Sequence, residues 1–246
     1  MIADPKKFAF FIPNIFTALN MACGFTSIIF SWHSSFYNAS MFLVLGGIFD
    51  LIDGRIARIT GTESSFGEQF DSMSDLVSFG LAPTLLVYQR FFVNFGRLGL
   101  IVSFLFLLCG ALRLARFNAN IDKVSSNFFQ GLPIPGAAYA LAGYVLVSLE
   151  FPIIVSKLYI ISFFYTLFYA FLMISNIPFC SFKNSEWVKG HKKLVLLLIF
   201  IILSALFLYE EFMIAILLSV YVAGSLGYFI VNRSRFTDIF DWKSEQ

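Results

Sequence analysis

Long apolar segments alternate with short polar ones along almost the whole chain. A membrane-spanning helix needs about 20 mostly apolar residues. Eight segments approach that length, at residues 14–32, 38–57, 70–90, 97–117, 134–150, 153–174, 193–209 and 212–231. The polar breaks at 150–152 and 209–211 are short, which predicts tight turns between antiparallel neighbours. The pattern therefore predicts an all-α integral membrane protein, a bundle of about eight transmembrane helices.

The composition supports a membrane protein and argues against several other classes. Hydrophobic residues make up 59% of the chain and charged residues 13%, whereas soluble domains carry about 25% charge. The three cysteines have no CxxC spacing and there are only two histidines, so a zinc site is not expected. The net charge is only +2 and the basic residues are spread along the chain, so we expect no nucleic-acid partner.

The basic residues predict an orientation. With the N-terminus in the cytoplasm, every Lys and Arg except Arg90, Arg97 and Lys157 falls on the inner side of the eight segments. This is the bias that membrane proteins show. We therefore expect both termini to be cytoplasmic, in a multi-pass protein of the cell (inner) membrane. Residues 1–246 are expected to form a single transmembrane domain.

Four aspartates stand where the second and third segments meet. Asp50 and Asp53 are three apart, and Asp71 and Asp75 are four apart, so each pair shares a helix face. The short connection at 59–66 would bring the two helices side by side and make the four carboxylates converge. Such a cluster is costly at a membrane edge unless cations neutralise it. Oxygen ligands suit Mg²⁺, Mn²⁺ or Ca²⁺, and two such ions are suited to a displacement at phosphorus.

Small and basic residues accompany the aspartates. Gly54, Ala57 and Gly67 would leave a cavity beside the carboxylates, and Arg58 could contact a phosphate. Each feature also has a simpler explanation. Small residues let membrane helices pack closely, and an arginine at a helix end extends to the interface.

Together these residues resemble the signature of the CDP-alcohol phosphatidyltransferases: an Asp pair, then Gly, Ala-Arg, Gly and a second Asp pair. All eight signature residues are present at the family's spacing: Asp50, Asp53, Gly54, Ala57, Arg58, Gly67, Asp71 and Asp75.

The resemblance implies a role for each residue. The four aspartates would hold two divalent ions, Mg²⁺ or Mn²⁺, and Asp75 would also act as general base on the acceptor hydroxyl. The CDP-lipid would contact Gly54, Ala57, Arg58 and Gly67, together with Ser64, which falls at a hydroxyl position of the family.

Further motifs resemble the branch of the family that makes phosphatidylserine. They are the sequences at 13–20, 113–118 and 129–138. Ile134 and Gly136 depart from that branch, which often has Ser and Ala there. Arg113, Arg116 and Asn118 would bind the acceptor, although arginines at an inner helix end also serve as positive-inside anchors. The resemblance covers about residues 8–145, the expected catalytic helices; the helices from about 153 to 231 match no motif.

The expected reaction transfers a phosphatidyl group from CDP-diacylglycerol to the hydroxyl of L-serine, giving phosphatidylserine and CMP. Glycerol phosphate, inositol phosphate or choline as acceptor is an alternative. A divalent-cation transporter is a second alternative, although transport sites usually lie near the bilayer midplane. Membrane lipid is an expected partner, and a homodimer agrees with the family's common assembly.

Overall fold

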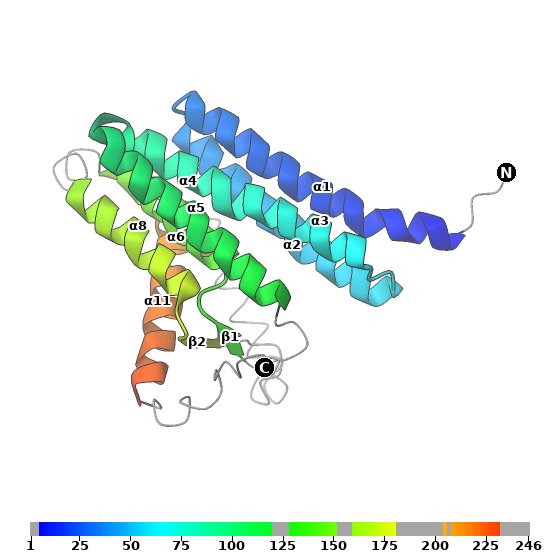
Figure 1. Ribbon diagram of the computed structural model, residues 1–246. Helices are drawn as coiled ribbons and strands as arrows, with labels where there is room; N and C mark the ends of the chain where they lie inside the picture. The colour runs from blue at the N-terminus through cyan, green and yellow to red at the C-terminus, as the bar shows by residue number, and fades with distance from the viewer. Residues whose placement is uncertain (1–4, 120–127, 152–158, 181–203, 206–207, 232–246) are drawn as a thin grey trace.

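The structure is a computed structural model, and it describes residues 5–119, 128–151, 159–180, 204–205 and 208–231. Its first two helices, α1 (Pro5–Trp32) and α2 (Phe36–Thr60), form a hairpin and pack along each other (Figure 1). They correspond to the first two predicted segments, but α1 begins nine residues earlier than the apolar pattern suggested, at Pro5 rather than 14. Gly61 ends α2 in the left-handed conformation, at φ 63°, which glycine adopts without strain.

The third predicted segment is a continuous helical stretch with changes of helix type. It comprises α3 (Ser65–Asp75), the π-helix η1 (Leu76–Leu81), α4 (Ala82–Val87), the π-helix η2 (Tyr88–Phe92) and the 3₁₀ turn η3 (Val93–Phe95). Pro83 explains the first π-helix, because a proline ring inside an α-helix collides with the carbonyl four residues earlier. The wider turn instead pairs the Ala82 N–H with the Val77 carbonyl. Asp75 therefore lies where the helix changes type, a common feature of functional sites.

The chain then reverses at Gly96, whose φ is +53°, into α5 (Gly96–Ala119). The later elements are β1 (Phe128–Gln130), α6 (Ile134–Glu150), α8 (Tyr159–Ile174), β2 (Pro178–Cys180) and α11 (Glu210–Val231). The strands β1 and β2 pair antiparallel, with Phe129 opposite Phe179. The apolar pattern did not predict this small sheet. The predicted helix at 193–209 lies almost wholly outside the described residues.

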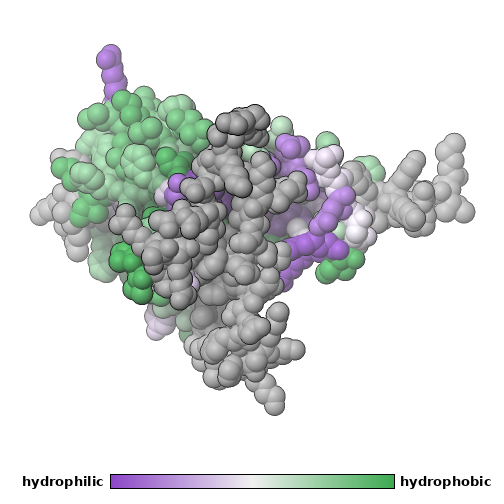
Figure 2. Space-filling view, turned by 60° about the horizontal axis from the view of Figure 1, so that its bottom comes forward, coloured by the Kyte–Doolittle hydropathy of each residue, from purple (hydrophilic) through white to green (hydrophobic). Residues whose placement is uncertain are grey.

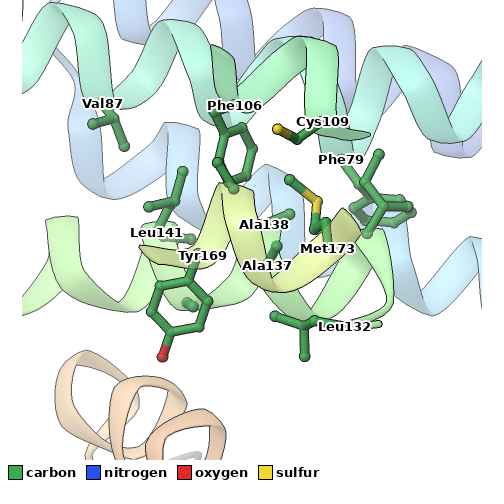
Figure 3. Packing of buried hydrophobic residues seen from close by; sticks show 14 of the residues in the cluster. Phe79, Val87, Phe106, Cys109, Leu132, Ala137, Ala138, Leu141, Tyr169 and Met173 are labelled. Carbon is green, nitrogen blue, oxygen red and sulfur yellow. The ribbon is translucent and has the colours of Figure 1, made fainter. Parts of the chain in front are cut away.

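The core surrounds α6, which packs against α2, α4, α8 and α11. Ala137, Ala138 and Leu141 of α6 meet Phe79, Phe106 and Met173 from other helices (Figure 3). Small residues allow these close approaches, as is usual between membrane helices. At Gly143 an added Cβ would lie 2.8 Å from the Ala215 backbone nitrogen of α11. This core fixes the relative positions of the helices that carry the four aspartates.

Three of the described helical stretches are long and apolar enough to cross a membrane: Phe11–Trp32, Ser65–Ala119 and Glu211–Val231. The second is 55 residues long and folds back on itself at Gly96. Several helices expose large apolar side chains, among them those of Phe25, Trp32 and Phe104. Figure 2 shows a broad hydrophobic surface on one side and hydrophilic residues gathered on another. The described residues therefore form a mostly helical membrane protein, as predicted, with a small two-stranded sheet in addition.

Candidate active site

The four aspartates predicted to converge lie together. Asp50, Asp53 and Asp71 each place a carboxylate oxygen within 4.8 Å of the others. Asp75 is close enough to Asp50 for a hydrogen bond between the two side chains. Among the described residues, Asp71 Oδ1 and Asp75 Oδ1 are buried and accept no hydrogen bond. Crowded carboxylates with unsatisfied buried oxygens are the ligand set that hard divalent cations prefer, so the donor set fits such ions.

The turn between α2 and α3 creates this convergence. The left-handed Gly61 terminates α2 one turn after Arg58. Ser64 then begins α3, since its Oγ accepts a hydrogen bond from the Gly67 N–H at 3.1 Å. This N-cap starts the helix at Ser65, five residues before the predicted start at 70. Consequently Gly67 lies on the first turn of α3 and not in the connection that precedes it.

The cluster has a supporting contact from α1 that the sequence reasoning did not identify. Thr17 Oγ1 donates a hydrogen bond to Asp53 Oδ2 at 2.8 Å, and Asp53 is only 5% exposed. Ser74, beside Asp75, donates to the Thr17 carbonyl at 3.0 Å. Thr17 thus links both aspartate-bearing helices and fixes one oxygen of Asp53. Partners that orient a ligand in this way commonly raise metal affinity.

We expect Thr17→Val to raise the divalent-cation concentration needed for half-maximal activity by about tenfold, because Asp53 loses its orienting hydrogen bond. Valine keeps the shape of threonine, so maximal activity at saturating metal should change little. Titrating activity with Mn²⁺ measures the effect. The matched control is Thr26→Val, since the Thr26 hydroxyl donates to the Ala22 carbonyl on the same helix, away from the aspartates. An unchanged metal requirement in Thr17→Val would contradict the orienting role.

Two cavities meet at the cluster. The smaller, about 300 Å³, is lined among the described residues by α1, α2, α3 and the connection between α2 and α3. The larger, about 780 Å³, is lined by α2 and α3 and by residues of α5, β1 and α6. Four residues line both: Gly54, Arg58, Glu68 and Asp71. The carboxylates therefore separate two spaces, as a reaction between two substrates requires.

The residues expected to contact a CDP-lipid line the smaller cavity. Gly54, Ala57, Arg58, Ser64 and Gly67 all belong to it. At Gly67 an added Cβ would lie 3.2 Å from Ser64 Oγ, so a larger residue would crowd the helix cap. The Arg58 Nε donates to the Gly54 carbonyl of the preceding turn at 2.7 Å. Asn14 and Glu68 also line this cavity but were not predicted.

The three residues expected to bind the acceptor are in different surroundings. Arg113 and Asn118 line the larger cavity. Arg113 is 7% exposed, its Nε has no hydrogen-bond partner among the described residues, and its guanidinium lies 5.7 Å from the Phe117 ring centroid. Asn118 Nδ2 donates to Ser72 Oγ at 2.9 Å, which ties α5 to α3. Arg116 is not among the cavity residues, and its guanidinium contacts backbone carbonyls instead.

A largely buried carboxylate cluster between two adjoining cavities could hold divalent ions beside two substrates, which is the arrangement that a metal-dependent membrane transferase requires. Residues 10–172 match the sequence model of the CDP-alcohol phosphatidyltransferase family. The chain belongs to this family. The match extends through most of α8, beyond the range of about 8–145 over which the motifs were recognised.

The names of similar proteins indicate which branch of the family this chain resembles. The chain is 38% identical over 192 residues to a CDP-diacylglycerol–serine O-phosphatidyltransferase of Helicobacter pylori, covering 78% of this chain and 80% of the relative. It is 39% identical over 177 residues to one of Methanocaldococcus jannaschii, covering 72% and 77%. An archaetidylserine synthase of Methanothermobacter thermautotrophicus is 38% identical over 149 residues, covering 59% and 63%.

Proposed function

We propose that this protein transfers the phosphatidyl group of CDP-diacylglycerol to the hydroxyl of L-serine, forming phosphatidylserine and CMP. The observation that carries this proposal is the four-carboxylate cluster between two cavities. The names of the relatives support serine as acceptor. The smaller cavity would take the CDP end of the lipid, and the larger cavity would take the acceptor.

The proposed roles follow the contacts of each residue. Asp50, Asp53, Asp71 and Asp75 would hold two divalent ions, Mg²⁺ or Mn²⁺. When bound, such ions offset the negative charge on the diphosphate and on the oxygens at phosphorus. Gly54 and Gly67 would let the diphosphate approach the helix backbones, while Arg58 and Ser64 supply polar contacts. Arg113 and Asn118 would hold the serine.

Asp75 would accept the proton of the serine hydroxyl, since among the two cavities it lines only the larger one, where the acceptor would bind. The serine oxygen then forms a bond to the phosphorus that carries the lipid. The bond from this phosphorus to the CMP oxygen breaks, and CMP leaves with the electron pair. Among the described residues, no Cys, Ser or His forms a nucleophile–base pair at the cluster, which favours direct transfer over a covalent intermediate.

We propose the same membrane placement as the basic residues indicate. The chain would form a single domain of eight transmembrane helices in the cell inner membrane, with both termini and the carboxylate cluster at the cytoplasmic face. The positive-inside bias supports this orientation. A homodimer is proposed from the family's common assembly.

CMP release from CDP-diacylglycerol by purified protein with different alcohols tests the proposed function. We expect serine to support the fastest release, and glycerol phosphate, inositol phosphate and choline to support at least about 100-fold less, because choline has no anion to pair with Arg113 and the two phosphates present a larger anion than the serine carboxylate. Arg113→Lys should raise the KM for serine by about tenfold, since lysine lacks the planar fork that pairs with a carboxylate.

The matched control is Arg97→Lys, at the other, exposed end of α5. A faster reaction with another alcohol would overturn the choice of serine while preserving the chemistry. Absence of CMP release with every alcohol would overturn the proposed function itself.

A further inference from the structure

Arg116 joins three parts of the chain that are distant in sequence. Its guanidinium donates to the carbonyls of Gln130 and Ile174, both at 2.9 Å, and to those of Met173 at 3.1 Å and Ser175 at 3.2 Å. These acceptors belong to β1, to the end of α8 and to the connection from α8 to β2. We call this set of contacts the Arg116 clasp.

The clasp satisfies groups that would otherwise lack partners. The last carbonyls of a helix have no donor within the helix, and Met173 and Ile174 are at the end of α8. An arginine is suited to this task because its planar group carries five N–H donors. The Asn176 side chain extends the network, since its Oδ1 accepts from Gln130 Nε2 at 2.9 Å and from Arg116 at 3.4 Å.

The segment held by the clasp forms one wall of the larger cavity. Phe129 and Pro135, on either side of the clasped Gln130 carbonyl, both line that cavity. Two backbone hydrogen bonds fix the same segment, from Gly131 N–H to the Ile177 carbonyl at 2.9 Å and from Leu132 N–H to the Leu172 carbonyl at 3.0 Å. The smaller cavity contains no residue of this segment.

Gly131 lies directly against the Arg116 clasp. Its φ is +75°, and an added Cβ would lie 2.4 Å from the Met173 carbonyl oxygen and 2.8 Å from the Arg116 guanidinium. Any side chain at residue 131 would thus push the clasp and the wall apart. Arg116 and Gly131 are therefore two separate places at which the same arrangement can be disturbed.

We infer that Arg116 is a positioning residue that sets the acceptor side of the active site, by holding the wall formed by Phe129 and Pro135 opposite Arg113 and Asn118. This inference rests on the proposed function, and it assigns Arg116 a role different from direct contact with the acceptor. Among the described residues, no member of the Arg116 clasp lines either cavity, so the clasp would act on the substrate through the wall.

Steady-state kinetics of Arg116→Lys and Gly131→Ala, varying each substrate in turn, test the inference. Both variants should raise the KM for serine by about tenfold, because a displaced wall weakens acceptor contacts. The KM for CDP-diacylglycerol should stay within about twofold, since its proposed cavity is untouched. The KM for serine of the double variant should be no higher than that of the more impaired single variant, as expected when two changes disturb one arrangement.

Controls for each change lie at the start of α5. Arg97→Lys repeats the arginine change at an exposed residue. Gly96→Ala repeats a substitution at positive φ, where an added Cβ meets nothing within 4 Å. Neither control should shift the KM for serine. If Gly131→Ala does not fold, Asn176→Ala gives a milder disturbance of the same network and should raise the same KM by a smaller factor.

Three outcomes would overturn the inference. A raised KM in Arg116→Lys alone, with Gly131→Ala and Asn176→Ala unchanged, would indicate direct acceptor binding. A lower unfolding temperature with both KM values unchanged would indicate a purely structural role. Equal increases in both KM values would place the disturbance elsewhere. If the wild type uses another alcohol, the same comparison with that alcohol tests the clasp separately from the choice of serine.

Discussion

Asp75→Asn is expected to lower the rate of CMP release by about 10³-fold or more, since a general base and a carboxylate ligand are lost in one change. Asparagine has the shape of aspartate but accepts no proton from the serine hydroxyl and carries no charge for a cation. Asp75 lies on α3 directly before the π-helix and is in contact with Asp50. Single-turnover CMP release at saturating serine measures the loss.

The fold should survive this change. Removing one of several crowded carboxylates relieves repulsion, so the unfolding temperature of Asp75→Asn without added metal should be no lower than that of the wild type. Glu150→Gln, at the exposed end of α6, is the matched control and should retain full activity. Near-wild-type activity of Asp75→Asn would remove Asp75 from the mechanism.

Removal of divalent cations is expected to lower the rate of CMP release by a similar factor. Chelation should lower CMP release by about 10³-fold or more, because the charge on the diphosphate and on the crowded carboxylates is then uncompensated. Mg²⁺ or Mn²⁺ added in excess should restore the rate. Full activity after exhaustive chelation would be incompatible with a metal role for the cluster.

Variants of individual aspartates link this metal dependence to the cluster. Asp53→Asn should shift the activating metal concentration further than Thr17→Val, since it removes a ligand and not only the orienting partner of that ligand. If Asp53→Asn responded to Mn²⁺ as the wild type does, the ions would have to bind elsewhere.

The convergence of the aspartates could be predicted because it depends on local spacing. Separations of three and four residues place each pair on one helix face, and a short connection makes the two helices neighbours. The contact of Thr17 with Asp53 could not be predicted in this way, since it spans 36 residues. The packing of α1 along α2 brings those side chains together.

Some features had signals in the sequence that the apolar pattern hides. Ser64, three residues before Gly67, is a typical helix N-cap, and it starts α3 five residues earlier than hydrophobicity indicated. Pro83 within an apolar run indicates a break in α-helical hydrogen bonding, which here takes the form of a π-helix.

Arg113 and Arg116 show where spacing alone is insufficient. Three residues along a helix correspond to about 300° of rotation, so the two side chains leave α5 in directions that differ by about 60°. One guanidinium lines the larger cavity and the other reaches β1 and the end of α8. The deciding partners are three-residue strands and a helix end, which are too short to leave a periodic pattern.

The most direct test of the carboxylate cluster is the anomalous scattering of Mn²⁺ in crystals of the purified protein. We predict two peaks, each bounded by oxygens of Asp50, Asp53, Asp71 or Asp75, at the point where the two cavities meet. Manganese found only at other residues, in crystals of enzyme that is active in solution, would contradict the account.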